Sequence, residues 1–156
     1  MPNIHIRPFI SGDENQISKL IHEVFDEFVA PGYSAEGNSF FYDFITPSAI
    51  AIRQQEQNNI LLAFLAKELA GMIEMRDNNH VSLLFTHKDY MGQGIARELL
   101  NDAISICLAR NPDVQTISVN ASPYSIPIYQ RLGFVPIGLL QQNNGITFLP
   151  MEMNLY

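Results

Sequence analysis

Tyr90-Met91-Gly92-Gln93-Gly94-Ile95-Ala96 is the stretch that decides the fold, because its glycines separate a strand-like run from a long amphipathic helix. Residues 81–86 form a short apolar run, and the apolar residues after Gly94 recur at helical spacing. The glycines therefore lie at a helix N-terminus, where unpaired backbone N–H groups and the helix dipole favour an anion. We expect a phosphate group at this loop, with a simple glycine turn as the alternative.

Two better-known phosphate-binding motifs fit the loop poorly. A P-loop requires a Lys-Ser or Lys-Thr pair after its glycines, and no such pair follows Gly94. A dinucleotide-binding fingerprint requires a third small residue, and this chain has Arg97 at that position. Both motifs are therefore disfavoured.

A second constellation lies further along the chain. Residues 115–120 are typical of a strand that ends at Asn120, and the short helix after it is closed by Gly133-Phe134. Together with the glycine loop, this order and spacing resemble the GNAT superfamily of acetyl-CoA-dependent N-acetyltransferases, over nearly the whole chain. The glycine loop resembles the pyrophosphate-binding motif of that family, and residues 128–134 resemble its Tyr-x-x-x-Gly-Phe helix. Met91 departs from the family pattern, which usually has Arg or Gln there.

The resemblance implies that acetyl-CoA is the cosubstrate and assigns residues to it. Backbone groups of residues 84–86 would bind the pantetheine amides, and an N–H of this segment would stabilise the oxyanion. Asn120 would bind the pantetheine or the acetyl-amide region; otherwise it is a residue of the turn after the strand. The residues expected to bind the cofactor are Leu84, Phe85, Thr86, Met91, Gly92, Gln93, Gly94, Ile95, Ala96, Asn120 and Tyr129.

Two residues are the catalytic candidates. Tyr129 matches the family position that protonates the departing thiolate; packing of its ring on the sheet is the alternative reading. Glu74 is a carboxylate between apolar neighbours in a predicted strand, where partial burial would raise its pKa toward that of a general base. An alternating strand with Glu74 facing solvent also explains the pattern. His80 and a water relay are the other candidates for the base.

The acceptor is expected to be an amine, either a small molecule or a peptide. In the resemblance the segment 23–44 lies over the acetyl end of the cofactor. It contains many aromatic residues beside carboxylates, which suits an amine on an apolar body. The same helical spacing of aromatic residues is also typical of side chains that pack in the hydrophobic core. The residues concerned are Phe25, Phe28, Tyr33, Phe40, Phe41, Tyr42 and Phe44, with Glu23, Asp26, Glu27 and Glu36.

Composition narrows the class of protein. The net charge of −7 argues against nucleic-acid binding, which needs a basic surface. The single Cys107 excludes an internal disulfide, and the N-terminus lacks the pattern of a signal peptide. The apolar run at residues 60–66 is too short to cross a membrane. We expect a cytoplasmic protein with no metal site, since Asp26 stands where a zinc-binding helix would need a second histidine after His22. A homodimer is possible.

The apolar patterns predict one domain over residues 1–156. Helices are expected at residues 13–28, 34–45, 95–107 and 124–133. Strands are expected at residues 4–7, 49–53, 60–66, 70–76, 81–86, 115–120, 135–140 and 147–155. This order suggests an α/β (α+β) fold with helices on both faces of a mixed sheet. The resemblance implies a three-layer α-β-α sandwich whose mostly antiparallel central sheet has about seven strands.

The function expected from these observations is transfer of an acetyl group from acetyl-CoA to an amine, without a covalent enzyme intermediate. A catalytically inactive acyl-CoA-binding module with a sensory or regulatory role is the alternative. Tyr129 and Asn120 favour the enzyme, whereas Met91 and the unassigned base leave the alternative open.

Overall fold

The structure, a computed structural model, describes residues 3–155. Its first half holds β1 (Ile4–Pro8), α1 (Glu14–Val24), a π-helical turn (Phe25–Val29), a 3-10 turn (Ala30–Gly32), α2 (Ala35–Phe44), α3 (Pro47–Glu56), β2 (Ile60–Leu65), β3 (Glu68–Arg76) and β4 (His80–Thr86). Its second half holds a 3-10 turn (Lys88–Tyr90), α4 (Ile95–Arg110), β5 (Thr116–Ala121), a 3-10 turn (Pro123–Ser125), α5 (Ile126–Leu132), β6 (Val135–Pro136), β7 (Gln141–Asn143) and β8 (Ile146–Asn154).

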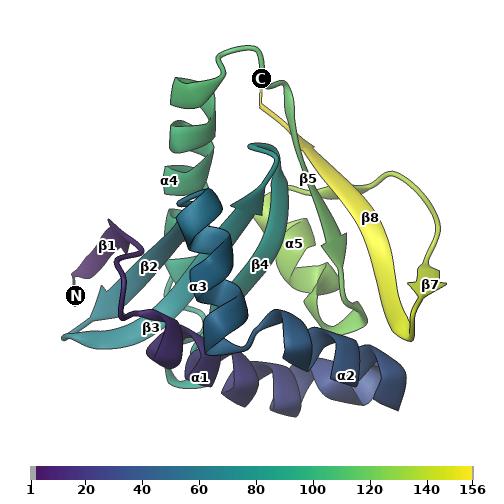
Figure 1. Cartoon of the computed structure of the whole chain (residues 1–156). Helices are drawn as coiled ribbons and strands as arrows, with labels where there is room; N and C mark the ends of the chain where they lie inside the picture. Colours follow the sequence, from purple (N-terminus) through teal and green to yellow (C-terminus); the bar gives the residue numbers. More distant parts are fainter. Residues whose placement is uncertain (1–2, 156) are drawn as a thin grey trace.

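The strands form one eight-stranded sheet in the order β1-β2-β3-β4-β5-β8-β6, with β7 paired to β8. Every pair among the described strands is antiparallel except β4–β5. Figure 1 shows β5 and β8 set apart from the β1–β4 part of the sheet. The predicted mixed, mostly antiparallel sheet is therefore confirmed, with eight strands where about seven were expected.

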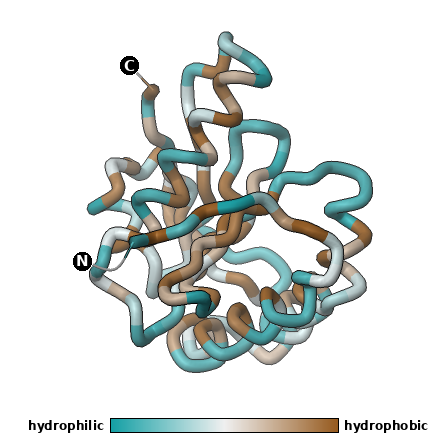
Figure 2. Tube along the Cα trace, turned by 90° about the vertical axis from the view of Figure 1, so that its left-hand side faces the viewer, coloured by the Kyte–Doolittle hydropathy of each residue, from teal (hydrophilic) through white to brown (hydrophobic). Residues whose placement is uncertain are grey.

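Helices cover both faces of the sheet, because alternate strand residues point to opposite sides. On one face Ile73 and Met75 pack with Leu99 of α4 and Tyr129 of α5. On the other face Met72 packs with helix residues from the first part of the chain, namely Ile17, Leu20, Ile21, Phe25 and Ile50. Figure 2 shows hydrophobic segments gathered in the interior of the molecule and hydrophilic ones in the outer turns. The predicted three layers are confirmed.

The strand predicted at residues 49–53 is wrong, because these residues belong to helix α3. Thr46-Pro47, which directly follows the helix predicted at residues 34–45, begins the next helix. The Thr46 hydroxyl accepts a hydrogen bond from the Ala49 N–H at 3.1 Å, and Pro47 occupies the first turn, where its missing N–H costs nothing. Ile50 is fully buried in the core cluster that also contains the apolar residues of α1, and this burial stabilises α3.

The strand predicted at residues 135–140 is right only at its start, since regular pairing with β8 covers Val135 and Pro136 alone. Pro136 has no N–H to donate to a ladder, and Gly138 follows closely. The turn between β7 and β8 has two residues, Asn144 and Gly145, with positive φ values of 54° and 79°.

Candidate functional site

The site begins where the two parallel strands of the sheet separate. β4 and β5 pair only at His80 with Ser118 and at Val81 with Val119. Beyond Val81 the β5-facing edge of β4 has no strand partner within residues 3–155. A register shift between Glu74 and Met75 in the neighbouring β3 marks a bulge, which bends strands locally. Backbone N–H and C=O groups along residues 82–86 are therefore available to an extended ligand.

A cavity of about 630 Å³ opens at this divergence. It is lined by residues from both strands, from the glycine loop and the start of α4, from α5, and from the helical segment before α2. All the residues expected to bind the cofactor line it except Gln93: they are Leu84, Phe85, Thr86, Met91, Gly92, Gly94, Ile95, Ala96, Asn120 and Tyr129. The fold thus brings segments distant in the sequence to one place.

The glycine loop ends at Gly94, which is the N-cap residue of α4. Gly94 has φ +85° and ψ 7°, a left-handed conformation that glycine adopts without strain, and no side chain caps the helix. The first intrahelical bond runs from the Glu98 N–H to the Gly94 carbonyl at 3.0 Å, so the N–H groups before Glu98 have no partner within the helix. This terminus has the chemistry of an anion site and fits a pyrophosphate.

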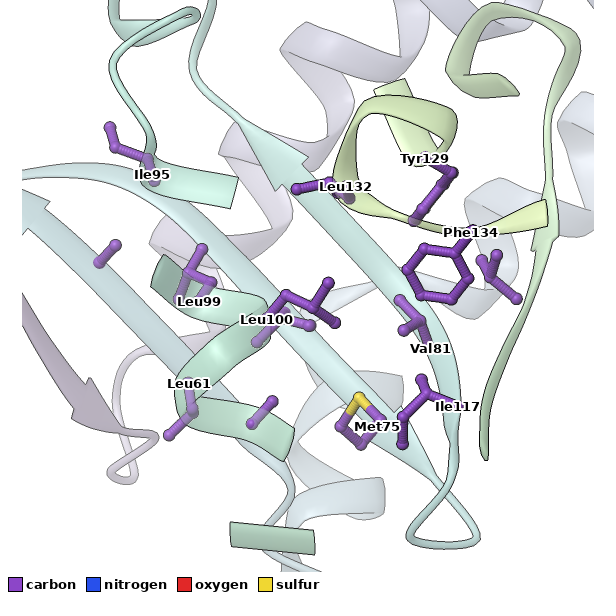
Figure 3. Packing of buried hydrophobic residues seen from close by; sticks show 14 of the residues in the cluster. Leu61, Met75, Val81, Ile95, Leu99, Leu100, Ile117, Tyr129, Leu132 and Phe134 are labelled. Atoms are coloured by element: carbon purple, nitrogen blue, oxygen red, sulfur yellow. The ribbon is translucent and has the colours of Figure 1, made fainter. Parts of the chain in front are cut away.

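Tyr129 lies on α5, where it belongs to the hydrophobic core and also lines the cavity. The ring meets Phe134 edge-to-face, with centroids 5.3 Å apart, and Figure 3 shows the two residues next to each other, with Val81 close to Phe134. Gly133, with φ +108°, ends α5 and lets the chain fold back so that the Phe134 N–H donates to the Tyr129 carbonyl. Burial raises the pKa of Tyr129, with Tyr33 as a second cause, so the phenol stays protonated.

Glu74 lies outside the cavity lining. It is buried on the face covered by α3, where its two carboxylate oxygens accept hydrogen bonds from Arg53 at 2.9 and 3.1 Å. Arg53 also donates to the Phe44 carbonyl and lies over the Phe44 ring. The solvent-facing alternative is therefore wrong, and a carboxylate held this way has a structural partner for its charge. The assignment of Glu74 as general base loses its geometric support.

His80 is half-buried at the last point where β4 and β5 pair. Its Nδ1 lies 2.7 Å from the Ser118 hydroxyl of β5. Burial lowers the pKa of His80, and the charge of Arg76 acts in the same direction. His80 is not among the residues that line the cavity. It joins the strands before they separate.

Only part of the predicted acceptor segment reaches the cavity. Phe25, Tyr33 and Phe41 line it, whereas Phe28, Phe40, Tyr42 and Phe44 do not. The five carboxylates of the segment are exposed and lie outside the lining: Glu23, Asp26, Glu27, Glu36 and also Asp43. Tyr42 donates a hydrogen bond to Asp26 at 2.6 Å, and Lys88 pairs with Glu27 at 3.2 Å.

Sequence reasoning missed several cavity residues. Tyr124 stacks on Phe28, with centroids 5.0 Å apart, and its hydroxyl donates to the Met91 sulfur at 3.8 Å. Arg97 and Arg131 add positive charge to the lining, and Arg97 donates to the Arg131 carbonyl at 2.8 Å. Arg97 lies in the first turn of α4, which directly follows Gly94. This position is the one signal in the sequence that could have identified Arg97 as a cavity residue.

Comparison with known proteins defines the class to which this fold and site belong. A sequence profile described as the Acetyltransferase (GNAT) domain matches residues 29–155. The chain therefore belongs to the GNAT acetyltransferase family and is an acyltransferase by that membership. No curated protein matches the chain in sequence.

Solved structures share the fold at low sequence identity. A GCN5-related N-acetyltransferase from Rhodopseudomonas palustris is 21% identical over 99% of this chain and 98% of its own, with a TM-score of 0.84. The PaiA N-acetyltransferase from Thermoplasma acidophilum, in complex with coenzyme A, is 20% identical over 97% and 99%, with a TM-score of 0.73. An aminoglycoside 6'-N-acetyltransferase complexed with coenzyme A is 14% identical over 97% of each chain, with a TM-score of 0.68.

Within residues 3–155 no helix combines the length and apolar character needed to cross a membrane. The same residues contain no group of three or more His, Cys, Asp or Glu side chains placed to hold a metal ion.

Proposed function

We propose that the protein transfers the acetyl group of acetyl-CoA to a primary amine by direct attack of the amine on the thioester. The observation that carries this proposal is the cavity between β4 and β5, which is lined both by the uncapped glycine terminus of α4 and by Tyr129. The coenzyme A complexes among proteins of the same fold support an acyl-CoA thioester as donor. Their N-acetyltransferase names support an amine as acceptor.

The phosphates would bind at the glycine end of the cavity. Backbone N–H groups at the start of α4 donate there, while Arg97 and Arg131 supply charge that Met91 does not. The pantetheine arm would then follow the unpaired edge of β4 along Leu84, Phe85 and Thr86, with Asn120 on the opposite side. An N–H on this edge would stabilise the oxyanion that forms during attack.

Tyr129 would act as the acid. Its raised pKa keeps the phenol protonated, and a thiolate leaving next to it can take the proton as the C–S bond breaks. The ring is held by Phe134 and by the core, so the hydroxyl position is set before substrate binds. General acid catalysis of this kind contributes roughly a factor of 10²–10⁴.

The test compares the wild type with Tyr129→Phe, which removes only the hydroxyl. We expect kcat to fall about 100-fold, with the Kd for acetyl-CoA nearly unchanged, measured by thiol release and by calorimetry. Tyr42→Phe is the matched control, since Tyr42 lies outside the cavity lining and should keep full activity. Tight acetyl-CoA binding with no transfer by the wild type to any amine would instead identify an inactive acyl-CoA-binding module.

A further inference from the structure

We propose that the acceptor is a weakly basic amine carried on a compact aromatic or branched apolar group, and that it enters the cavity uncharged. This inference rests on the proposed N-acetyl transfer and names the substrate class of the same site. It follows from the wall of the cavity beyond the β4 edge, called here the aromatic wall: Val24, Phe25, Val29, Tyr33, Phe41 and Phe85.

The aromatic wall is preorganised by its own contacts. Phe25 stacks on Phe41, with centroids 4.0 Å apart and planes 13° apart. Tyr33 meets Phe25 edge-to-face at 5.7 Å, and Phe85 lies 6.1 Å from Phe41. Phe25 is fully buried, so the wall keeps its shape without a ligand. Such a surface favours an apolar or aromatic body.

The wall offers no partner to an ammonium ion. Among the described residues that line the cavity there is no Asp, Glu or His. The nearby carboxylates point to other partners: Asp26 accepts from Tyr42, and Glu27 pairs with Lys88. The mutual stacking of Phe25 and Phe41 covers one face of each ring, which is then closed to a cation.

Beside the aromatic wall an ammonium ion would therefore lose its hydration with no partner for its charge. A neutral amine has no charge that needs such a partner. Tyr33 supplies the polar contact that a neutral amine needs. Burial raises the pKa of Tyr33 to about 12, so its hydroxyl stays protonated and can both donate and accept a hydrogen bond. A longer acyl chain on the thioester could also fill the space beside the aromatic wall, but it would leave the Tyr33 hydroxyl without a hydrogen-bond partner.

The transfer step needs no general base when the amine is neutral on entry. The nitrogen lone pair forms the C–N bond to the thioester carbonyl, the C–S bond breaks, and its electron pair goes to sulfur. Tyr129 gives its proton to the sulfur and regains one from the amine nitrogen through water. The products are the amide and free coenzyme A, and no oxidant, reductant or further reactant is required.

The experiment measures kcat/KM at pH 7 for four amines with acetyl-CoA. Phenylalanine amide and 4-methylaniline are weakly basic and aromatic, 2-phenylethylamine has the same ring on a strongly basic amine, and spermidine is a cationic chain. We expect the first two to exceed the last two by at least about tenfold. The value for 2-phenylethylamine should rise about tenfold per pH unit, because its neutral fraction grows toward a pKa of about 10.

Phe41→Ala and Phe41→Leu test the wall, with Phe40→Ala as the matched control because Phe40 is exposed on the same helix outside the lining. We expect the KM for 4-methylaniline to rise about tenfold in Phe41→Ala and less in Phe41→Leu, which preserves packing, with no change in the control. Circular dichroism verifies the fold of each variant.

Three results overturn the inference. The first is a preference for spermidine, and the second is an unchanged KM in Phe41→Ala. The third is a preference for hexanoyl-CoA over acetyl-CoA that Phe41→Ala abolishes, since the aromatic wall would then contact the acyl chain and not the acceptor. Each of these leaves N-acyl transfer intact. Absence of acetyl-CoA binding in calorimetry, or of transfer to every amine, overturns the proposed function as well.

Discussion

At the scale of single residues, Asp13 shows how a charge is stabilised at the junction of β1 and α1. Arg7 donates to both carboxylate oxygens at 2.8 and 3.0 Å, and the Ile10 N–H adds a bond of 2.8 Å. These contacts, led by the Arg7 hydrogen bonds, lower the pKa of Asp13 below its ordinary 3.8. The ionised form therefore stabilises the fold above pH 3.8, and this contribution is lost as pH falls through the lowered pKa.

We expect Asp13→Asn to lower the free energy of unfolding at pH 7 by about 2 kcal/mol. The gap to the wild type should narrow as pH falls from 3.8 through the lowered pKa, because the carboxylate of the unfolded chain is protonated first and that of the folded chain follows. Urea unfolding at pH 7 and pH 3 measures both values. Asp43→Asn, at an exposed position, should be neutral. A gap of equal size at both pH values would show that ionisation of Asp13 does not contribute.

Substitutions at Gly94 and Met91 distinguish pyrophosphate binding by backbone N–H groups from binding by side chains. Gly94→Val forces a β-branched residue into a left-handed conformation and places a side chain against the anion site, so the Kd for coenzyme A should rise at least about tenfold. Met91→Ala should change that Kd less than about threefold, because the backbone N–H groups remain. Calorimetry gives both values. Equal losses would mean that side chains, not the backbone, bind the phosphates.

At the scale of elements, Gly71 sets the distance between β3 and α4. A Cβ at this position would lie 2.9 Å from the Ile95 side chain and 3.0 Å from the Phe85 carbonyl oxygen. The missing side chain therefore lets the first turn of α4 approach the strand closely. This contact places the glycine loop beside the β4 edge, so it is also a contact of the site.

Gly71→Ala should lower the free energy of unfolding by about 1–3 kcal/mol, because the added methyl group overpacks a fully buried contact. Coenzyme A binding should weaken as the α4 terminus moves. Gly32→Ala is the control, since a Cβ there first meets a Pro123 side-chain atom at 3.9 Å. Denaturant unfolding and calorimetry test the two effects, and a stable variant with normal binding would exclude this role of Gly71.

At the scale of the whole molecule, the C-terminal hairpin meets the start of α2. The Ser34 N–H donates to the Gly145 carbonyl at 3.1 Å, and a Cβ on Gly37 would collide with the same carbonyl. Because α2 also carries Phe41, the turn between β7 and β8 fixes the position of one wall of the cavity. Two segments from opposite ends of the chain thus shape the acceptor side together.

Gly37→Ala should displace the hairpin turn from α2 and raise the KM for the acceptor amine by at least about threefold. The Kd for acetyl-CoA should stay the same, since the glycine loop lies elsewhere. Ser39→Ala, exposed on the same helix, is the control. Steady-state kinetics and calorimetry separate the two quantities. A matching loss in cofactor binding would mean that the hairpin supports the whole cavity.

Much of the fold follows from local pattern, as particular elements show. Short apolar runs bounded by turn residues predicted β2, β3 and β4, and the helical spacing after Gly94 predicted α4. The strand predicted at residues 49–53 failed because Thr46-Pro47 is compatible with both the end and the start of a helix. Burial of Ile50 and the ion pair between Arg53 and Glu74 favour the helix, and both are contacts with residues far along the chain.

The sequence by itself determined the glycine loop, the Tyr129 helix and their order, because these depend on backbone conformation and spacing within short segments. Only the tertiary structure decided which side chains reach the cavity. It placed Glu74 against Arg53 and away from the lining, and brought Phe25, Tyr33 and Phe41 into the lining with the neighbouring carboxylates outside it. The physical reason is that burial and ion pairing are set by contacts between distant segments, which no local pattern encodes.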